Sequence, residues 1–68
     1  MLQNHIEELI RKSPYKREYI QNKLGVTANT MTSWVKGRTY PNAKHLFMMA
    51  DLLGVSVEDL YTYKKDED

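Results

Sequence analysis

A helix predicted after Thr27 places five residues on one face, four of them with short side chains: Ala28, Asn29, Thr32, Ser33 and Lys36. Residues three and four apart lie on the same side of an α-helix. Asn, Thr and Ser offer hydrogen-bond donors and acceptors, and Ala offers a small apolar contact. A solvated helix face more commonly carries long Glu and Lys side chains. This face is therefore suited to approach base edges in the major groove of DNA.

A pair of short helices, between Lys16 and Gly37 and joined by a tight turn at Gly25, must position this face. Their apolar residues follow spacings of three and four, which predicts one buried stripe. These residues are Tyr15, Ile20 and Leu24 in the first helix and Met31, Trp34 and Val35 in the second. Thr27 is expected to cap the second helix. Small domains insert one helix into the major groove with this arrangement.

Charge is strongly segregated along the chain, although the net charge is only +1. Residues 11–45 hold eight basic residues against one acid, Glu18, which is a net charge of +7. Residues 1–10 carry −2, and residues 46–68 carry −4. The basic block coincides with the helix pair and the loop after it, as expected of a phosphate-binding surface. Charge alone is equally compatible with an ordinary solvated face.

An N-terminal helix is predicted over Gln3 to Lys12. Its expected apolar face consists of Leu2, Ile6, Leu9 and Ile10. Ser13 and Pro14 break this helix, and they either open the next one or precede a start nearer Lys16.

Two further helices are predicted after the loop GRTYPN. Asn42 is expected to cap the fourth helix and Gly54 to end it. Its expected core residues are Ala43, Leu46, Phe47, Ala50 and Leu53. Ser56 then starts a short fifth helix that holds Val57 and Leu60. No segment is predicted to form a strand, so the expected fold is all-α with five helices.

A family resemblance rests on a set of positions that covers almost the whole chain, from Leu2 to Tyr61. These positions are Ile20, Gly25, Val26, Thr27, Met31, Trp34, Gly37, Pro41, Leu46, Ala50 and the segment LLGVSVEDL from Leu52 to Leu60. In this pattern the chain resembles the XRE family of helix-turn-helix domains, typified by the lambda repressor and Cro. The resemblance implies a compact five-helix domain whose second and third helices form the helix-turn-helix. Gln21 departs from the family pattern, because the family usually has a small Ala there.

The resemblance also implies which residues contact DNA. Ala28, Asn29, Thr32 and Ser33 occupy the base-reading positions of the family. The implied phosphate contacts are Arg17, Thr27, Arg38, Thr39 and Tyr40, with Lys36 and Lys44 as secondary ones. Because no Arg or Gln stands in the centre of the reading surface, we expect a DNA site with essential A·T pairs.

The implied function is that of a sequence-specific, double-stranded DNA-binding transcriptional regulator, and a Cro-like repressor fits best. A bacterial or phage origin is implied by the family alone. Useful specificity calls for two subunits on a pseudo-palindromic operator, hence a weak homodimer or dimerisation on DNA. The expected contact lies near Leu52, Val55 and Tyr61. The alternative is a protein-interaction module, an antirepressor or partner-binding subunit, that would use the acidic C-terminal third.

Composition excludes several other classes of protein. The 68 residues predict one domain over 1–63, followed by a charged tail, 64–68, that is expected to be disordered. Without cysteine, and with His5 and His45 on different helices, no metal site or other cofactor is expected. No apolar stretch approaches the roughly 20 residues of a membrane span, so a cytoplasmic protein is predicted. No catalytic motif is present, and an enzyme is rejected.

Overall fold

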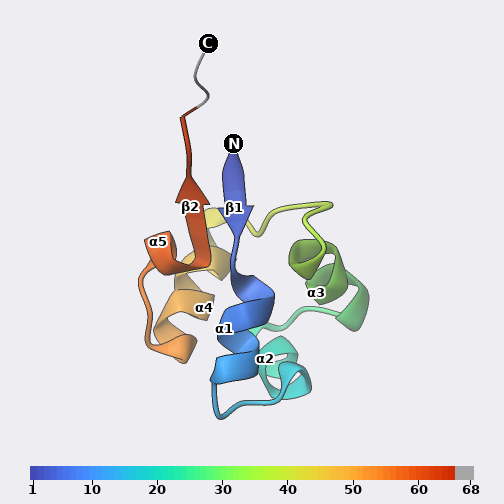
Figure 1. Ribbon diagram of the computed structural model, residues 1–68. Helices are drawn as coiled ribbons and strands as arrows, with labels where there is room; N and C mark the ends of the chain where they lie inside the picture. Colours follow the sequence, from blue (N-terminus) through green and yellow to red (C-terminus); the bar gives the residue numbers. More distant parts are fainter. Residues whose placement is uncertain (66–68) are drawn as a thin grey trace.

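The computed structural model describes residues 1–65, which form five short helices and a small two-stranded sheet around one core (Figure 1). In chain order the elements are β1 (Leu2–Asn4), α1 (Ile6–Lys12), α2 (Arg17–Leu24), α3 (Ala28–Val35), α4 (Ala43–Leu53), α5 (Val57–Leu60) and β2 (Tyr61–Tyr63). The predicted all-α five-helix fold is confirmed apart from the sheet. The last three residues of the tail expected over 64–68 lie outside the described residues.

The sheet pairs two segments from opposite ends of the described chain, and the prediction that no strand forms was wrong. β1 and β2 are antiparallel, with Leu2 opposite Tyr63 and Asn4 opposite Tyr61. Each strand has only three residues, too few for a visible alternation of apolar and polar positions. The pairing depends on a partner remote in sequence, which a local pattern does not reveal.

The sheet also changes where α1 begins. The helix starts at Ile6 rather than Gln3, because the backbone N–H of Ile6 donates to the side-chain oxygen of Asn4 over 2.9 Å. Leu2 consequently belongs to β1, where it is 45% exposed, and not to the apolar face of the helix.

The loop between α1 and α2 decides between the two predicted starts of α2. The helix begins at Arg17 after Lys16, so the start nearer Lys16 is correct. Ser13 instead closes α1, since its hydroxyl donates to the carbonyl of Ile10 over 2.8 Å. Tyr15 therefore precedes α2 rather than lying in it, and its ring stacks on that of Tyr19 with centroids 5.0 Å apart.

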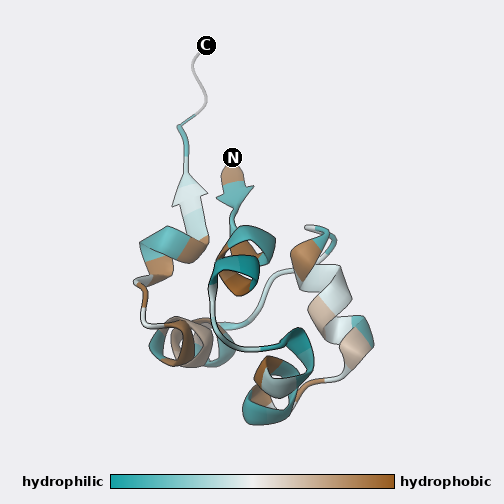
Figure 2. Cartoon of the chain, turned by 60° about the horizontal axis from the view of Figure 1, so that its bottom comes forward, coloured by the Kyte–Doolittle hydropathy of each residue, from teal (hydrophilic) through white to brown (hydrophobic). Residues whose placement is uncertain are grey.

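The buried core lies between the helices, whose apolar sides turn inward (Figure 2). It comprises Ile6, Ile20, Leu24, Met31, Trp34, Met49, Ala50 and Leu60. The predicted core face of α4 is confirmed at Leu46, Ala50 and Leu53 but was wrong at Ala43 and Phe47. Met49 is fully buried, whereas Ala43 is exposed and Phe47 is 63% exposed. Positions 46, 49, 50 and 53 face inward at spacings of three and four, which leaves Phe47 on the outer side.

Helix ends are defined largely as predicted. The side chains of Thr27, Asn42 and Ser56 accept from a backbone N–H three residues on, and Ser56 forms a full capping box with Asp59. Gly25 ends α2 in the left-handed conformation, with φ of 72°, which disfavours residues that carry a Cβ. These local devices place α3 directly after a sharp turn from α2.

Candidate nucleic-acid interface

Helix α3 lies at one side of the molecule, where it packs against α1 and α2 (Figure 1). Met31 is fully buried and Trp34 is 4% exposed, so these two residues hold the helix to the core. The ring of Trp34 also meets that of His45 on α4, with centroids 5.6 Å apart. Much of the ribbon of α3 is pale in Figure 2, which marks residues of intermediate hydropathy.

The N-terminal end of α3 presents free polar groups. Thr27 accepts the backbone N–H of Thr30 through its hydroxyl at 3.1 Å, which satisfies one of the otherwise unpaired donors there. Ala28 and Asn29 follow, and both are exposed. Among residues 1–65 no group hydrogen-bonds the side-chain amide of Asn29. The amide is thus available to an external partner.

The middle of α3 carries the other two predicted reading residues, Thr32 and Ser33, both half-buried. Within the described part of the chain the Ser33 hydroxyl is unpaired, whereas the Thr32 hydroxyl accepts a hydrogen bond from the guanidinium of Arg17. Arg17, at the first position of α2, was expected to reach a phosphate. In the structure its side chain reaches the reading helix, and the phosphate contact stays a prediction.

The C-terminal end of α3 is held by Asn4, a residue that sequence reasoning placed inside the first helix. Its side-chain amide donates to the carbonyls of Trp34 at 2.6 Å and Val35 at 3.3 Å. The amide oxygen of the same side chain accepts from Ile6. Asn4 therefore links the end of α3 to the start of α1. The sequence could have suggested only the local bond to Ile6, because Asn close to the start of an apolar helical pattern commonly accepts a helix N–H.

The loop after α3 returns to the helix and exposes basic and polar side chains. The backbone N–H groups of Arg38 and Thr39 both donate to the Ser33 carbonyl, at 2.9 and 3.4 Å. Gly37 makes this return possible with φ of 75°. Lys36, Arg38 and Thr39 are exposed, so three predicted phosphate contacts border the reading face.

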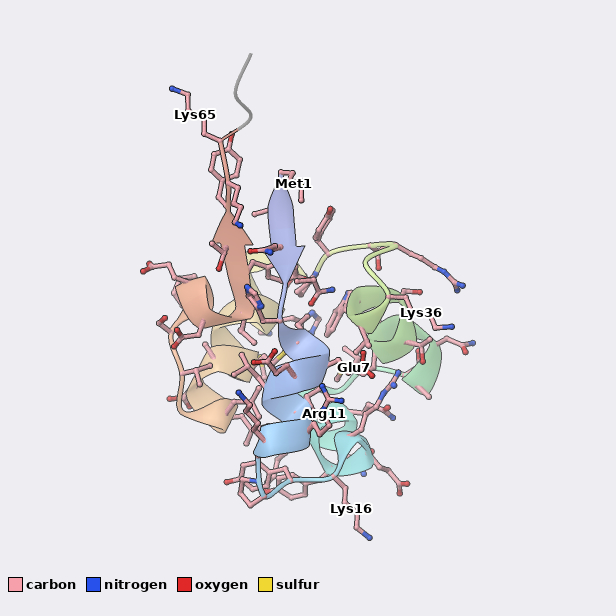
Figure 3. All side chains as sticks on the ribbon, viewed as in Figure 1. Met1, Glu7, Arg11, Lys16, Lys36 and Lys65 are labelled. Carbon is pink, nitrogen blue, oxygen red and sulfur yellow. The ribbon has the colours of Figure 1, made fainter. Side chains whose placement is uncertain are left out.

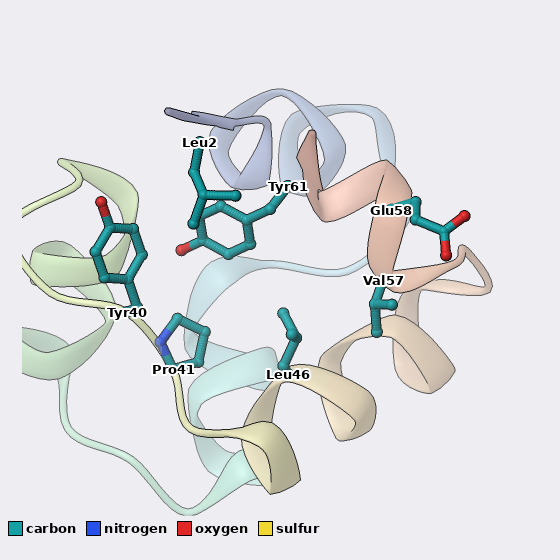
Figure 4. A pocket seen from close by; sticks show the side chains of 7 residues that line it. All are labelled: Leu2, Tyr40, Pro41, Leu46, Val57, Glu58 and Tyr61. Atoms are coloured by element: carbon teal, nitrogen blue, oxygen red, sulfur yellow. The ribbon is translucent and has the colours of Figure 1, made fainter. Parts of the chain in front are cut away.

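Tyr40 and Lys44 lie farther along this border. Lys44 is exposed in the first turn of α4, and Tyr40 is 58% exposed. The Tyr40 ring meets that of Tyr61 edge to face at 5.8 Å. Together with Leu2, Pro41, Leu46, Val57 and Glu58, the two tyrosines line an apolar cavity of about 280 Å³ (Figure 4). Tyr40 thus braces the loop against the sheet.

The electrostatics of this region favour anions. In residues 1–65 the only ion pair is Lys12 with Glu8 on α1, at 3.0 Å, so Lys36, Arg38 and Lys44 have no carboxylate partner. Hydrogen bonding to Lys12, aided by its charge, holds the pKa of Glu8 below its usual range. Lys36 extends from the end of α3 and Lys16 from the far end of the molecule, both away from the core (Figure 3).

Residues 1–65 contain neither a candidate metal-binding cluster nor a membrane-spanning helix. No group of three His, Cys, Asp or Glu side chains there could hold a metal ion. His5 instead shares a hydrogen bond with the Thr62 hydroxyl at 3.1 Å. No helix of residues 1–65 is long and apolar enough to cross a membrane.

The sequence of this chain is similar to those of known proteins. Residues 5–66 match the model of the Cro/C1-type HTH DNA-binding domain. The chain is 37% identical over 51 residues to an uncharacterized HTH-type transcriptional regulator of Methanocaldococcus jannaschii, covering 75% of this chain and 77% of that protein. It is also 40% identical over 63 residues to one of Haemophilus influenzae, covering 93% of this chain but only 26% of the longer relative. The chain belongs to the XRE family of Cro/C1-type helix-turn-helix DNA-binding regulators, which are not enzymes.

Proposed function

We propose that this protein is a Cro-like transcriptional repressor of a bacterial or phage-infected cell, and that it reads an operator in the major groove with α3. The observation that carries this proposal is the free hydrogen-bonding face of α3. Asn29 and Ser33 have unpaired side chains there among the described residues, and both relatives named above are HTH-type transcriptional regulators.

In this proposal the reading residues contribute differently. The amide of Asn29 can pair with both N6 and N7 of adenine, and the hydroxyl of Ser33 can reach several base edges. Ala28 is placed to touch a thymine methyl group. Thr27, Lys36, Arg38, Thr39, Tyr40 and Lys44 contact phosphates around this face. Such contacts fix the register of the protein on DNA but carry no sequence information.

Two subunits on one operator form the second part of the proposal, because one helix covers only a few base pairs. Half-sites about 34 Å apart would present matching major-groove faces to a symmetric pair. The contact between subunits is assigned to the surface near Leu52, Val55 and Tyr61. All three side chains are half-buried, so each keeps some exposed surface. Sedimentation with operator DNA should show two subunits per duplex.

The deciding experiment compares base reading with phosphate binding, after binding-site selection from random duplex DNA. Asn29→Ala and Ser33→Ala should each cost about 1 to 3 kcal/mol on the selected site and relax preference at one position. Non-specific binding should remain nearly intact. Arg38→Ala is the matched control, since its loss should weaken binding to all sequences and reduce the salt slope by about one unit.

Two outcomes would count against the proposal. If both α3 variants fold and bind the selected site with unchanged affinity and base preference, α3 is not the reading element. If the wild type binds no duplex from a random pool at low salt, the acidic surface of Asp51, Glu58 and Asp59 becomes the better candidate site. The protein would then be an interaction module that has kept the fold.

A further inference from the structure

The hydrogen bond between Arg17 and Thr32 places an arginine side chain beside α3. The proposed reading face does not yet include this side chain. The Arg17 guanidinium donates to the Thr32 hydroxyl oxygen, in a partly buried contact between α2 and α3. A guanidinium has five N–H donors and no acceptor. In residues 1–65 the Thr32 hydroxyl donates to no other protein group. Its proton therefore remains free, and the outer side of the pair is rich in donors.

The position of Arg17 is not explained by the stability of the free protein. No carboxylate in the described part of the chain forms an ion pair with it. It occupies the first position of α2, and a cation is disfavoured there because the helix N-terminus carries partial positive charge. Holding this long side chain against Thr32 also restricts its rotamers. An external acceptor would compensate for these costs.

We propose that Arg17 and Thr32 act as one reading unit that selects guanine, an inference that rests on the proposed function of α3. In the major groove guanine presents two neighbouring acceptors, O6 and N7, whereas adenine presents N7 beside a donating N6 amino group. A pair that offers donors matches guanine and leaves a donor unpaired at adenine. A DNA site with essential A·T pairs was expected because no Arg or Gln stands in the centre of the reading surface on α3. Arg17 supplies that chemistry from α2.

The test removes hydrogen-bonding groups on both sides of the contact, first from the base and then from the protein. At the guanine selected by the wild type, replacement by 7-deazaguanine removes N7 and leaves O6. Wild-type affinity should fall about 5- to 150-fold, the range expected when a buried donor is left without its acceptor. Arg17→Ala should bind the guanine duplex correspondingly more weakly and lose its sensitivity to the deaza substitution. Thr32→Val, which keeps the shape but removes the hydroxyl, should reduce that sensitivity while preference at other positions stays the same.

Arg17→Lys separates base reading from simple charge. Lysine keeps the positive charge but lacks the planar fork, so the salt slope should be retained while the preference for guanine falls. Lys36→Ala is the matched control and should weaken binding on all sequences while the 7-deazaguanine effect persists. Circular dichroism of each variant verifies that the fold is intact.

A different set of results for the Arg17 variants would identify Arg17 as a phosphate contact. If Arg17→Ala weakens guanine and non-guanine duplexes equally, retains the deaza effect and lowers the salt slope by about one unit, the reading unit is excluded. Such a result would leave the proposed function of α3 standing, because selected-site binding and the Asn29 effect would persist. Absence of any guanine from the selected sites would also overturn the inference. Failure to bind any duplex would overturn both proposals.

Discussion

The two ends of α3 are held in opposite ways. At the N-terminal end Thr27 caps the helix from within the same segment, three residues before its partner Thr30. At the C-terminal end Asn4 reaches the carbonyls of Trp34 and Val35 from thirty residues away. The first end is exposed and the second is partly buried against β1 and α1. The end proposed to meet DNA is therefore held by a local cap alone, whereas a residue distant in sequence holds the other end.

The largest effect is expected at the buried side of the C-terminal end. Trp34→Ala removes a nearly fully buried aromatic ring, a change that costs about 3 to 5 kcal/mol of unfolding free energy. Domains of this size have little more than that, so the variant should be largely unfolded. Circular dichroism and urea titration provide the measurement. A cooperative transition at the wild-type midpoint would show that the ring is not part of the core.

Asn4→Ala should have the next largest effect. It removes the donor that two carbonyls of α3 share, although the Trp34 carbonyl still accepts the backbone N–H of Gly37, and it leaves the N–H of Ile6 without its acceptor. This loss costs about 1 to 3 kcal/mol. Asn4→Asp is the matched control because it keeps the acceptor for Ile6, loses the donor to α3 and adds a negative charge near the negative end of that helix. Urea denaturation should rank wild type above both variants. Equal stability of Asn4→Asp and wild type would contradict the role assigned to the amide donor.

Thr27→Ala tests the local cap at the other end. Loss of the cap should reduce stability by about 1 kcal/mol, less than the loss of Asn4, since the site is exposed and water can replace the hydroxyl. Thr27→Ser retains the hydroxyl and should stay close to wild type in the same urea titration. If Thr27→Ala proved more damaging than Asn4→Ala, the contrast between the two ends would be reversed.

The smallest effect on stability is expected from substitution of Tyr61, which lies opposite Asn4 in the strand pair. Its hydroxyl is buried without a hydrogen-bond partner within residues 1–65, so Tyr61→Phe should leave stability unchanged or raise it by up to about 1 kcal/mol. A loss above that size would mean that the hydroxyl has a partner.

The same substitution tests a pH dependence. Burial, with a smaller contribution from Tyr40, raises the pKa of Tyr61 to about 12 from an ordinary value near 10. The folded state therefore keeps this proton longer than the unfolded state. The resulting stability is complete below pH 10 and is lost as pH rises toward 12. Unfolding of wild type and Tyr61→Phe across this range should show the steeper decline in the wild type.

Local features could be predicted from the sequence. The caps at Thr27, Asn42 and Ser56 and the turn at Gly25 each depend on residues only a few positions apart, and all four are confirmed. The helix pair and the buried Met31 and Trp34 follow from spacing in the same way. The assignment of individual residues to bases or phosphates stays a prediction.

Features set by distant partners could not be predicted. The β1–β2 pairing and the bond from Asn4 to α3 join segments that no local pattern connects. Arg17 was correctly placed at a helix start, but the direction of its side chain depends on Thr32 across the turn. Phe47 and Met49 are both large and apolar, so composition did not decide which of them faces the core.

The pairing of β1 with β2 has a consequence for the order of folding. Closing a loop that contains nearly the whole described chain costs more conformational entropy than forming any one helix or turn. The sheet should therefore form after the helices, and Asn4 can bind the end of α3 only then. During unfolding, opening of the strand pair would release the C-terminal end of α3 while Met31 still holds the helix to the core. Amide hydrogen exchange should thus be faster in β1 and β2 than in the core helices, and the recognition helix would acquire its final orientation in the last step of folding.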